Sequence, residues 1–140
     1  MCGICGIIGL TDKEIAENTI SKMNAAIAHR GPDDEGVFID SGIALGHRRL
    51  SIIDLSKNGH QPMFSADGGF ALIYNGELYN YKSLRLELQR AKVGDSNAAY
   101  SFRTQSDSEV IIAAYQRWGA ECVKYFNGMF AFAIWDKQKE

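Results

Sequence analysis

The sequence has few of the features that mark membrane or disulfide-rich proteins. Its 140 residues include three cysteines, an odd number, and two prolines. It has no apolar run long enough to cross a bilayer, and no basic residue precedes the short, glycine-rich apolar stretch at its N-terminus, as a signal peptide would require. We therefore expect a cytoplasmic protein without a disulfide framework.

The sequence also lacks a strong excess of charge of either sign. Fifteen basic and 17 acidic residues give a formal net charge of −2, with no basic cluster. Because nucleic acids and anionic membranes attract such clusters, we expect neither as a partner. The remaining composition, 46% hydrophobic and 23% charged, is typical of a soluble globular protein, and the length suits one domain over residues 1–140.

Alternating and β-branched segments predict antiparallel strands. The expected strands cover residues 2–9, both arms of a hairpin that turns at Ser41-Gly42, a strand from residue 69 into a turn at Asn75-Gly76, a short strand over 100–103, and a strand over 129–136. Residues 136–140 resemble the turn of a hairpin whose returning strand is absent. We therefore expect the chain to be the front part of a longer polypeptide.

Periodic apolar residues between these strands predict helices. The expected helices are one over about 12–28 with a capping box of Thr11 and Glu14, one capped by Asn80, one from Ser106 to Gly119 with Glu109 completing a second capping box, and a short one through Cys122. Helices grouped between antiparallel strands indicate an α+β fold.

The pair Cys2 and Cys5 could belong to a zinc site, a redox pair or a disulfide, or could be two unrelated cysteines. A structural zinc site needs four ligands, whereas Cys122 and the three histidines are scattered, so no metal is expected. A redox pair needs a helix N-terminus, but this pair runs into a strand pattern. Cys5 and Cys122 are best explained as packed apolar residues.

Cys2 differs because removal of Met1 would make it the N-terminal residue. In model compounds a thiol has a pKa of about 8.5 and an α-amine a pKa of about 7.7–8.0, so the amine could take the thiol proton directly or through water. The α-amine of Cys2 would then be the general base for its own thiol. A retained Met1 would convert this amine into an amide and leave the thiol without that base.

Six segments occur in a recognisable order: Cys2-Gly3-Ile4, HRGPDDEG at 29–36, HRRLSIID at 47–54, NGELYN at 75–80, SDSE at 106–109 and GMFAFAIWD at 128–136. Together they resemble the class II glutamine amidotransferases, most closely the N-terminal glutaminase domain of glutamine-hydrolysing asparagine synthetases. The Pro32-Asp33 pair and RLSIID favour this branch over relatives that act on phosphosugars. The resemblance implies the N-terminal nucleophile hydrolase fold, a four-layer α/β/β/α sandwich of antiparallel sheets, truncated here at its C-terminal end.

The resemblance also implies a role for each matching residue. Cys2 would attack the side-chain amide of L-glutamine to give a thioester and ammonia, and water would release glutamate. The Asn75 side chain and the Gly76 N–H would stabilise the oxyanion. The residues expected to bind glutamine are Arg49, Leu50, Ser51, Ile52, Ile53, Asn75, Gly76, Glu77 and Asp107.

Within this set, Arg49 would bind the α-carboxylate, and Asp107, with Glu77 nearby, the α-ammonium. Taken alone, Arg49 suits a solvated strand charge, Asp107 suits a first-turn acid favoured by the helix dipole, and Asn75-Gly76 suits a hairpin turn. His29 and Arg30 are expected to order the loop beside the nucleophile rather than to catalyse.

No cofactor is expected in this domain. ATP and Mg²⁺ would bind only in a synthetase domain of the same full-length chain, which would use the ammonia to make asparagine. A homodimer is compatible with the resemblance. Two other functions stay open: the same glutaminase serving an acceptor other than aspartate, and a non-catalytic module of the same fold. Residues 91–104 depart from the usual family linker, so the pocket rim is expected to differ.

Overall fold

The computed structural model describes residues 1–52, 55–90 and 99–139. In these ranges the chain forms two antiparallel three-stranded sheets. The first sheet has the order β1-β3-β2, and its strands are β1 (Gly3–Ile8), β2 (Asp34–Asp40) and β3 (Ile43–Arg49). The second has the order β4-β5-β6, and its strands are β4 (Met63–Phe64), β5 (Phe70–Leu78) and β6 (Gly128–Asp136).

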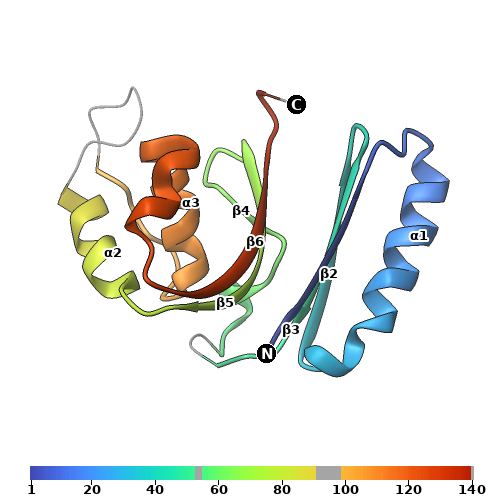
Figure 1. Ribbon diagram of the computed structural model, residues 1–140, viewed down its shortest axis with the longest axis horizontal. Helices are drawn as coiled ribbons and strands as arrows, with labels where there is room; N and C mark the ends of the chain where they lie inside the picture. Colours follow the sequence, from blue (N-terminus) through green and yellow to red (C-terminus); the bar gives the residue numbers. More distant parts are fainter. Residues whose placement is uncertain (53–54, 91–98, 140) are drawn as a thin grey trace.

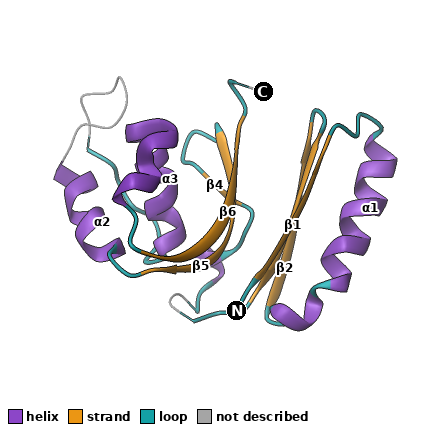
Figure 2. Ribbon diagram, in the orientation of Figure 1, coloured by secondary structure: helices purple, strands orange, loops and turns teal. Residues whose placement is uncertain are grey.

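Helices cover the outer sides of the two sheets. The α-helices of the described ranges are α1 (Lys13–Ala26), α2 (Tyr81–Arg90) and α3 (Asp107–Trp118), and the 3₁₀ helices are η1 (Ala28–Arg30), η2 (Lys57–Gly59) and η3 (Gly119–Tyr125). The two sheets form adjacent layers, with α1 on the outer side of the first sheet and α2 and α3 on the outer side of the second (Figures 1 and 2). The predicted α+β class is confirmed.

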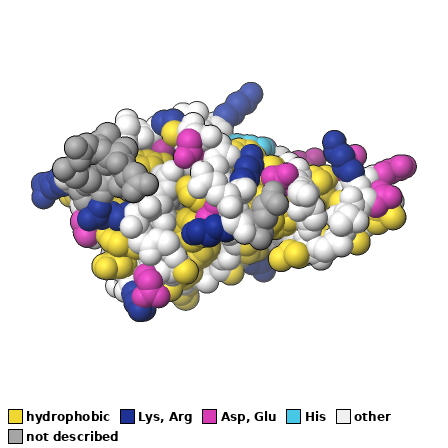
Figure 3. Space-filling view, turned by 90° about the horizontal axis from the view of Figure 1, so that it is seen from above, with side chains coloured by type: hydrophobic (Ala, Val, Ile, Leu, Met, Phe, Trp, Pro, Cys, Tyr) yellow, Lys and Arg dark blue, Asp and Glu magenta, His cyan; other side chains and the backbone are white. Residues whose placement is uncertain are grey.

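Two features of the surface bear on the expected partners. No helix of the described ranges has the length and apolar character needed to span a bilayer. Acidic and basic side chains are interspersed on the face seen from above (Figure 3). The expectation of a cytoplasmic location stays a prediction.

Strand β5 serves two hydrophobic cores because successive side chains of a strand point to opposite faces. Ala71 and Ile73 are buried between the sheets with Ile43 and Leu45 of β3. The opposite face of β5 packs against α2 and α3. The buried residues of this second core include Leu72, Tyr74 and Leu78 of β5, Leu84 and Leu88 of α2, and Val110 and Ile111 of α3. The alternation puts Asn75 on the face that looks toward the first sheet.

The register of the first sheet places the start of β1 beside the end of β3. β2 and β3 form the predicted hairpin, with Asp40 opposite Ile43 and Gly42 at a φ of 72° in the turn. β1 pairs antiparallel with β3, with Gly3 opposite Arg48. The N-terminal end of the chain therefore lies beside the end of β3 and the residues that follow it.

The first helix does not use its predicted cap. Asp12 is the N-cap residue of α1, and its carboxylate accepts the N–H of Ile15 at 3.1 Å. The prediction that Thr11 and Glu14 form a capping box is therefore wrong, because an acceptor one residue later takes the orphan N–H. The predicted end of α3 at Gly119 is confirmed, with a φ of 59° that suits glycine.

Two predictions concerning β5 and the residue before α2 are wrong. Asn75-Gly76 is not a turn, since β5 pairs with β6 without interruption through both residues to Leu78. Asn80 precedes α2, but its side chain does not cap the helix. The side-chain amide donates to the Tyr125 carbonyl at 2.8 Å and accepts the Asn127 N–H at 3.0 Å, which ties the start of α2 to the segment before β6.

Two shorter segments differ from the predictions, and a third agrees with them. Residues 100–103 form no strand, since the Arg103 N–H is bound by a carboxylate of α3. The predicted short helix through Cys122 is present as the 3₁₀ helix η3, and Cys122 itself is buried, as expected for a packed apolar residue. The two-residue strand β4 was not predicted because it is too short to show an alternating pattern.

Candidate active site

One pocket collects most of the residues proposed to bind glutamine. It lies where β1 begins, where β3 ends and where β5 passes the N-terminus of α3. The predicted residues that line it are Cys2, Arg49, Leu50, Ile52, Asn75, Gly76, Glu77 and Asp107. Ser51 is outside this lining and donates its N–H to Asp33 at 2.8 Å. Ile53 lies outside the described residues.

The thiol of Cys2 is held against the backbone of Leu50. Its Sγ is 3.3 Å from the Leu50 nitrogen and 3.6 Å from the Leu50 oxygen. The protonated thiol can donate to the carbonyl, and the thiolate can accept the N–H. Arg30 donates from Nε to the Cys2 carbonyl at 3.2 Å, which orders the chain beside the sulfur.

The other two cysteines have different surroundings. Cys5 packs against Ala16 and Ile20 of α1 and Ala44 of β3, and burial raises the pKa of its thiol. Burial also raises the pKa of the Cys122 thiol. Of the three cysteines, only Cys2 lines the pocket. Within the described ranges, no three His, Cys, Asp or Glu side chains gather closely enough to hold a metal ion.

Arg49 presents a buried guanidinium at the end of β3. Only 8% of the residue is exposed, and Nη1 donates to the Ser56 carbonyl at 2.9 Å. A solvated strand charge would be exposed, so that simpler interpretation does not apply. A planar guanidinium so placed suits a carboxylate ligand, because its donors match the two carboxylate oxygens.

Asp107 presents a buried carboxylate at the first residue of α3. It is 4% exposed, and its Oδ2 accepts the hydroxyl of Tyr74 at 2.8 Å and the N–H of Leu78 at 3.2 Å. The helix dipole favours an acid at this position, which agrees with the simpler interpretation of Asp107 as a first-turn acid. The two bonds to β5 also fix the carboxylate beside the strand that carries Asn75.

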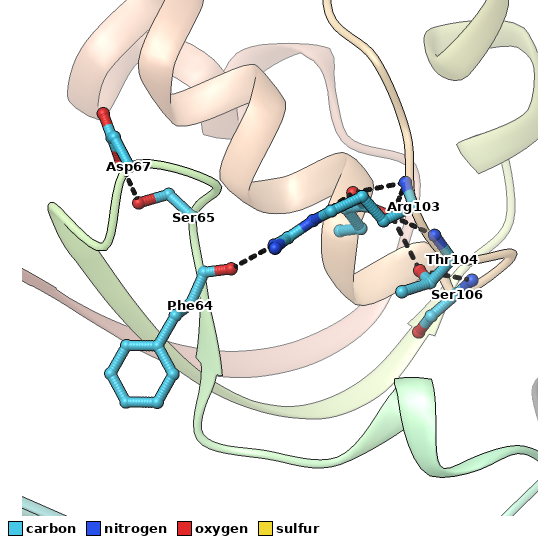
Figure 4. A network of polar contacts seen from close by, with 7 residues as sticks. Phe64, Ser65, Asp67, Arg103, Thr104 and Ser106 are labelled. Carbon is cyan, nitrogen blue, oxygen red and sulfur yellow. Dashed lines mark hydrogen bonds and ion pairs between the residues drawn. The ribbon is translucent and has the colours of Figure 1, made fainter.

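The segment before α3 is fastened by the buried carboxylate of Glu109. This group accepts the N–H of Arg103 at 2.9 Å and both the N–H and hydroxyl of Thr104, at 2.7 and 2.8 Å. Arg103 also reaches across to the Phe64 carbonyl at 2.7 Å (Figure 4). Ser106 caps α3 as predicted, but Glu109 turns back to residues 103 and 104 and leaves the capping box incomplete.

The backbone of β5 leaves Gly76 free to serve the pocket. In an antiparallel strand, the N–H and C=O groups of alternate residues point to the same edge. Phe70, Tyr74 and Leu78 all bond on the edge away from β6. The Gly76 N–H therefore points to that edge too. A Cβ on Gly76 would overlap the Met129 carbonyl of β6, so only glycine fits here.

Several pocket residues were not predicted: Met1, Gly59, Gln61, Tyr74, Ser106, Ser108 and Met129. Tyr74, Ser106 and Ser108 each adjoin a predicted residue, which is the signal that could have indicated them. Gly59 and Gln61 occur in a stretch that the sequence marks only as a loop, and their approach to the pocket depends on tertiary packing.

Comparisons with known proteins identify the family of this chain. Residues 1–140 match the glutamine amidotransferase domain family. The chain is 44% identical to glutamine-hydrolyzing asparagine synthetase 1 of Bacillus subtilis over 98% of its own length. It is 38% identical to asparagine synthetase B of Escherichia coli over its whole length, and 38% identical to amidase chry2 of Gibberella zeae over 91%.

The chain spans only part of each of these relatives, namely 21%, 24% and 18% of their lengths. The family match, by contrast, extends over the whole of this chain. The protein therefore belongs to the glutamine amidotransferase domain family.

Proposed function

We propose that the protein hydrolyses L-glutamine to L-glutamate and ammonia through a thioester on Cys2. The observation that carries the proposal is one pocket that contains a thiol, a buried guanidinium and a buried carboxylate. The two buried charges suit the two ends of an amino-acid zwitterion, and the thiol suits attack on its side chain. The names of the relatives, glutamine-hydrolyzing asparagine synthetases, support glutamine as that amino acid.

The nucleophile in this proposal requires the loss of Met1. Met1 lines the same pocket as Cys2, so its removal would widen the pocket and expose the Cys2 α-amine. That amine takes the thiol proton, and the sulfur attacks the side-chain amide carbon. The proton then passes to the leaving nitrogen, ammonia departs, and a thioester is left. Attack by water on the thioester carbon releases glutamate and restores the thiol.

Asn75 and Gly76 stabilise the oxyanion of each tetrahedral intermediate. Asn75 offers its side-chain amide from the face of β5 that looks toward the first sheet. Gly76 offers an N–H that the ladder with β6 does not use. In other acyl-transfer enzymes, one such donor stabilises the transition state by about 3 kcal/mol.

Substrate capture falls to the charged residues. Arg49 binds the α-carboxylate, and Asp107, with the exposed Glu77 on the rim, binds the α-ammonium. Leu50 and Ile52 form the neighbouring wall, which we extend to Ser51 and Ile53.

We further propose that the ammonia serves a synthetase domain of a longer chain. The length of the relatives supports this, since the present chain covers 24% of asparagine synthetase B. ATP and Mg²⁺ would act in that domain, and a homodimer is one assembly it could adopt. The fold would then be the four-layer N-terminal nucleophile hydrolase sandwich, completed by residues beyond 140.

Glutamine hydrolysis tests the proposal directly. Protein shown by intact mass to have lost Met1 should release ammonia and glutamate in a one-to-one ratio. Adding ATP and aspartate should not change the rate or yield asparagine. Processed, folded protein that releases no ammonia would contradict the proposal and favour the non-catalytic module. Asparagine formation by these 140 residues would contradict the assignment of acceptor chemistry to another domain.

A second acceptor has one observation in its favour. The relative from Gibberella zeae is named an amidase rather than an asparagine synthetase. The glutaminase step would be the same for either acceptor. In the longer protein, ATP-dependent amide formation from carboxylates other than aspartate would identify this alternative.

A further inference from the structure

Each polar group of Tyr74 lies against a side chain from another part of the chain. Its N–H donates to Oε1 of Gln61 at 2.6 Å, and its carbonyl lies 3.0 Å from Nε2 of His47. Its hydroxyl donates to Asp107 at 2.8 Å. Tyr74 is 3% exposed and directly precedes Asn75, so these contacts surround the peptide next to the proposed oxyanion site.

The two backbone contacts replace a strand that ends too early. β4 pairs with β5 only at Ala71 and Leu72, so among the described residues no strand pairs with this edge of β5 at Tyr74. Gln61 and His47 bind the N–H and carbonyl that a longer β4 would have bound. Buried backbone polar groups are costly when unpaired, which explains why two polar side chains, themselves 5% and 0% exposed, are buried here.

The protonation of these groups is consistent with fixed bonds. Burial lowers the pKa of His47 to about 4, so the ring is neutral at pH 7. Because a carbonyl only accepts, Nε2 must carry the ring proton. Burial and the neighbouring Asp107 raise the pKa of the Tyr74 hydroxyl, which keeps its proton and donates it to the carboxylate.

Gln61 extends the arrangement to α3. Its Nε2 donates to the hydroxyl of Ser108 at 3.2 Å, one residue beyond Asp107. β5 and the N-terminus of α3 are thus joined through the side chains of Gln61 and Tyr74, which reach Ser108 and Asp107, and also by the direct bond from the Leu78 N–H to Asp107. Together these contacts fix the distance between the strand that carries Asn75 and the carboxylate proposed for the substrate ammonium, and the Tyr74 hydroxyl is the side-chain donor among them that reaches this carboxylate.

We infer that Tyr74 and Gln61 are positioning residues that set the ammonium-binding carboxylate of Asp107 against the oxyanion site of β5. The inference rests on the proposed function. The Tyr74 hydroxyl occupies Oδ2 of Asp107 and aims the carboxylate, so that the α-ammonium of the substrate is recognised. Tyr74 would therefore control the preference for substrates that carry an α-amine.

The test compares L-glutamine with glutaramate, which is glutamine without its α-amino group. In Tyr74→Phe, kcat/KM for glutamine should fall by about tenfold or more, as loss of a hydrogen bond to a charged group implies. The value for glutaramate should change by less than about twofold, since no ammonium is bound. The preference for glutamine should fall by the ratio of these changes.

Tyr115→Phe is the matched control. Its hydroxyl also donates to a carboxylate, Asp136, at 3.3 Å, but neither residue lines the pocket. This variant should keep the wild-type preference. In an Asp107→Asn background, Tyr74→Phe should cause little further loss for glutamine, because the two changes remove one interaction.

Gln61→Met tests the other side chain. It removes both hydrogen bonds at nearly constant length, so the strand beside Asn75 loses its support. We expect kcat to fall for both substrates, with cooperative thermal unfolding retained. Unchanged kcat would show that Gln61 has only a structural role.

The outcomes separate this inference from the proposed function. A wild-type protein that hydrolyses glutamine, combined with an unchanged preference in Tyr74→Phe, would overturn the inference alone. A processed wild-type protein that hydrolyses neither substrate would overturn the proposed function and the inference with it. An equal loss for both substrates in Tyr74→Phe would also overturn the inference, since it would indicate a general disturbance of the pocket.

Discussion

The guanidinium of Arg49 occupies space that exists because residue 59 is glycine. A Cβ atom on Gly59 would lie 2.7 Å from Cζ of Arg49 and would overlap Nη2. The guanidinium also donates to the carbonyl of Ser56, in the same loop. The loop that follows β3 thus folds back over the side chain at the end of β3 and fixes its direction.

Gly59→Ala should therefore act on substrate capture. The added methyl would push the guanidinium away from the proposed α-carboxylate site. KM for glutamine should rise by roughly ten- to hundredfold, since small displacements of binding groups have effects of this size. Steady-state kinetics with glutamine measure the change.

Gly69→Ala is the control for this substitution. A Cβ there would approach only Asp67, at 3.3 Å, outside the pocket. Its kinetics should match the wild type. A normal KM in Gly59→Ala would show that Arg49 does not need its observed position.

Arg49→Ala and Asp107→Asn should each weaken glutamine capture. Each change removes the charge opposite one end of the zwitterion, so kcat/KM should fall by about a hundredfold or more for a loss of about 3 kcal/mol. Unchanged kinetics in Asp107→Asn would reduce this residue to a helix N-terminal acid.

His47 should make stability depend on pH. Its pKa is lowered from 6.5 to about 4, mainly by burial, and the ionisable groups near it include Asp34, His60 and Arg49. Between these pH values the unfolded state binds more protons than the folded state, so stability is lost as the pH falls from about 6.5 to 4. The loss from this residue should approach about 3 kcal/mol.

His47→Gln should remove most of this dependence, since the glutamine amide can donate to the Tyr74 carbonyl without titrating. Urea unfolding at pH 7 and pH 4 measures the difference. His29→Gln, at an exposed histidine, should retain the wild-type dependence. An equal pH dependence in His47→Gln and wild type would contradict the assignment.

The fold was largely predictable because its signals are local. The hairpin at Gly42 and the end of α3 at Gly119 follow from turn and cap residues. The errors arose where distant contacts decide local structure. Asn75-Gly76 has the sequence of a turn, but β6 pairs with it and keeps it extended. Asn80 has the sequence of a cap, but the segment before β6 takes its side chain.

The site was predictable only in part for the same reason. Cys2, Arg49 and Asp107 belong to motifs that occur in order along the chain, and the fold brings them to one pocket. Gln61 reaches the pocket because β4 is short and leaves the edge of β5 open. No local pattern in the sequence states the length of a partner strand.

The central claim is that Cys2, as the N-terminal residue, is the nucleophile, and covalent labelling tests it most directly. A diazoketone analogue of glutamine should add once to the processed protein, and peptide mass spectrometry should find the adduct on Cys2. Cys2→Ala should take no label and release no ammonia. Cys5→Ala should be labelled and should release ammonia as the wild type does. An adduct on Cys5 or Cys122, or ammonia release by Cys2→Ala at the wild-type rate, would contradict the account.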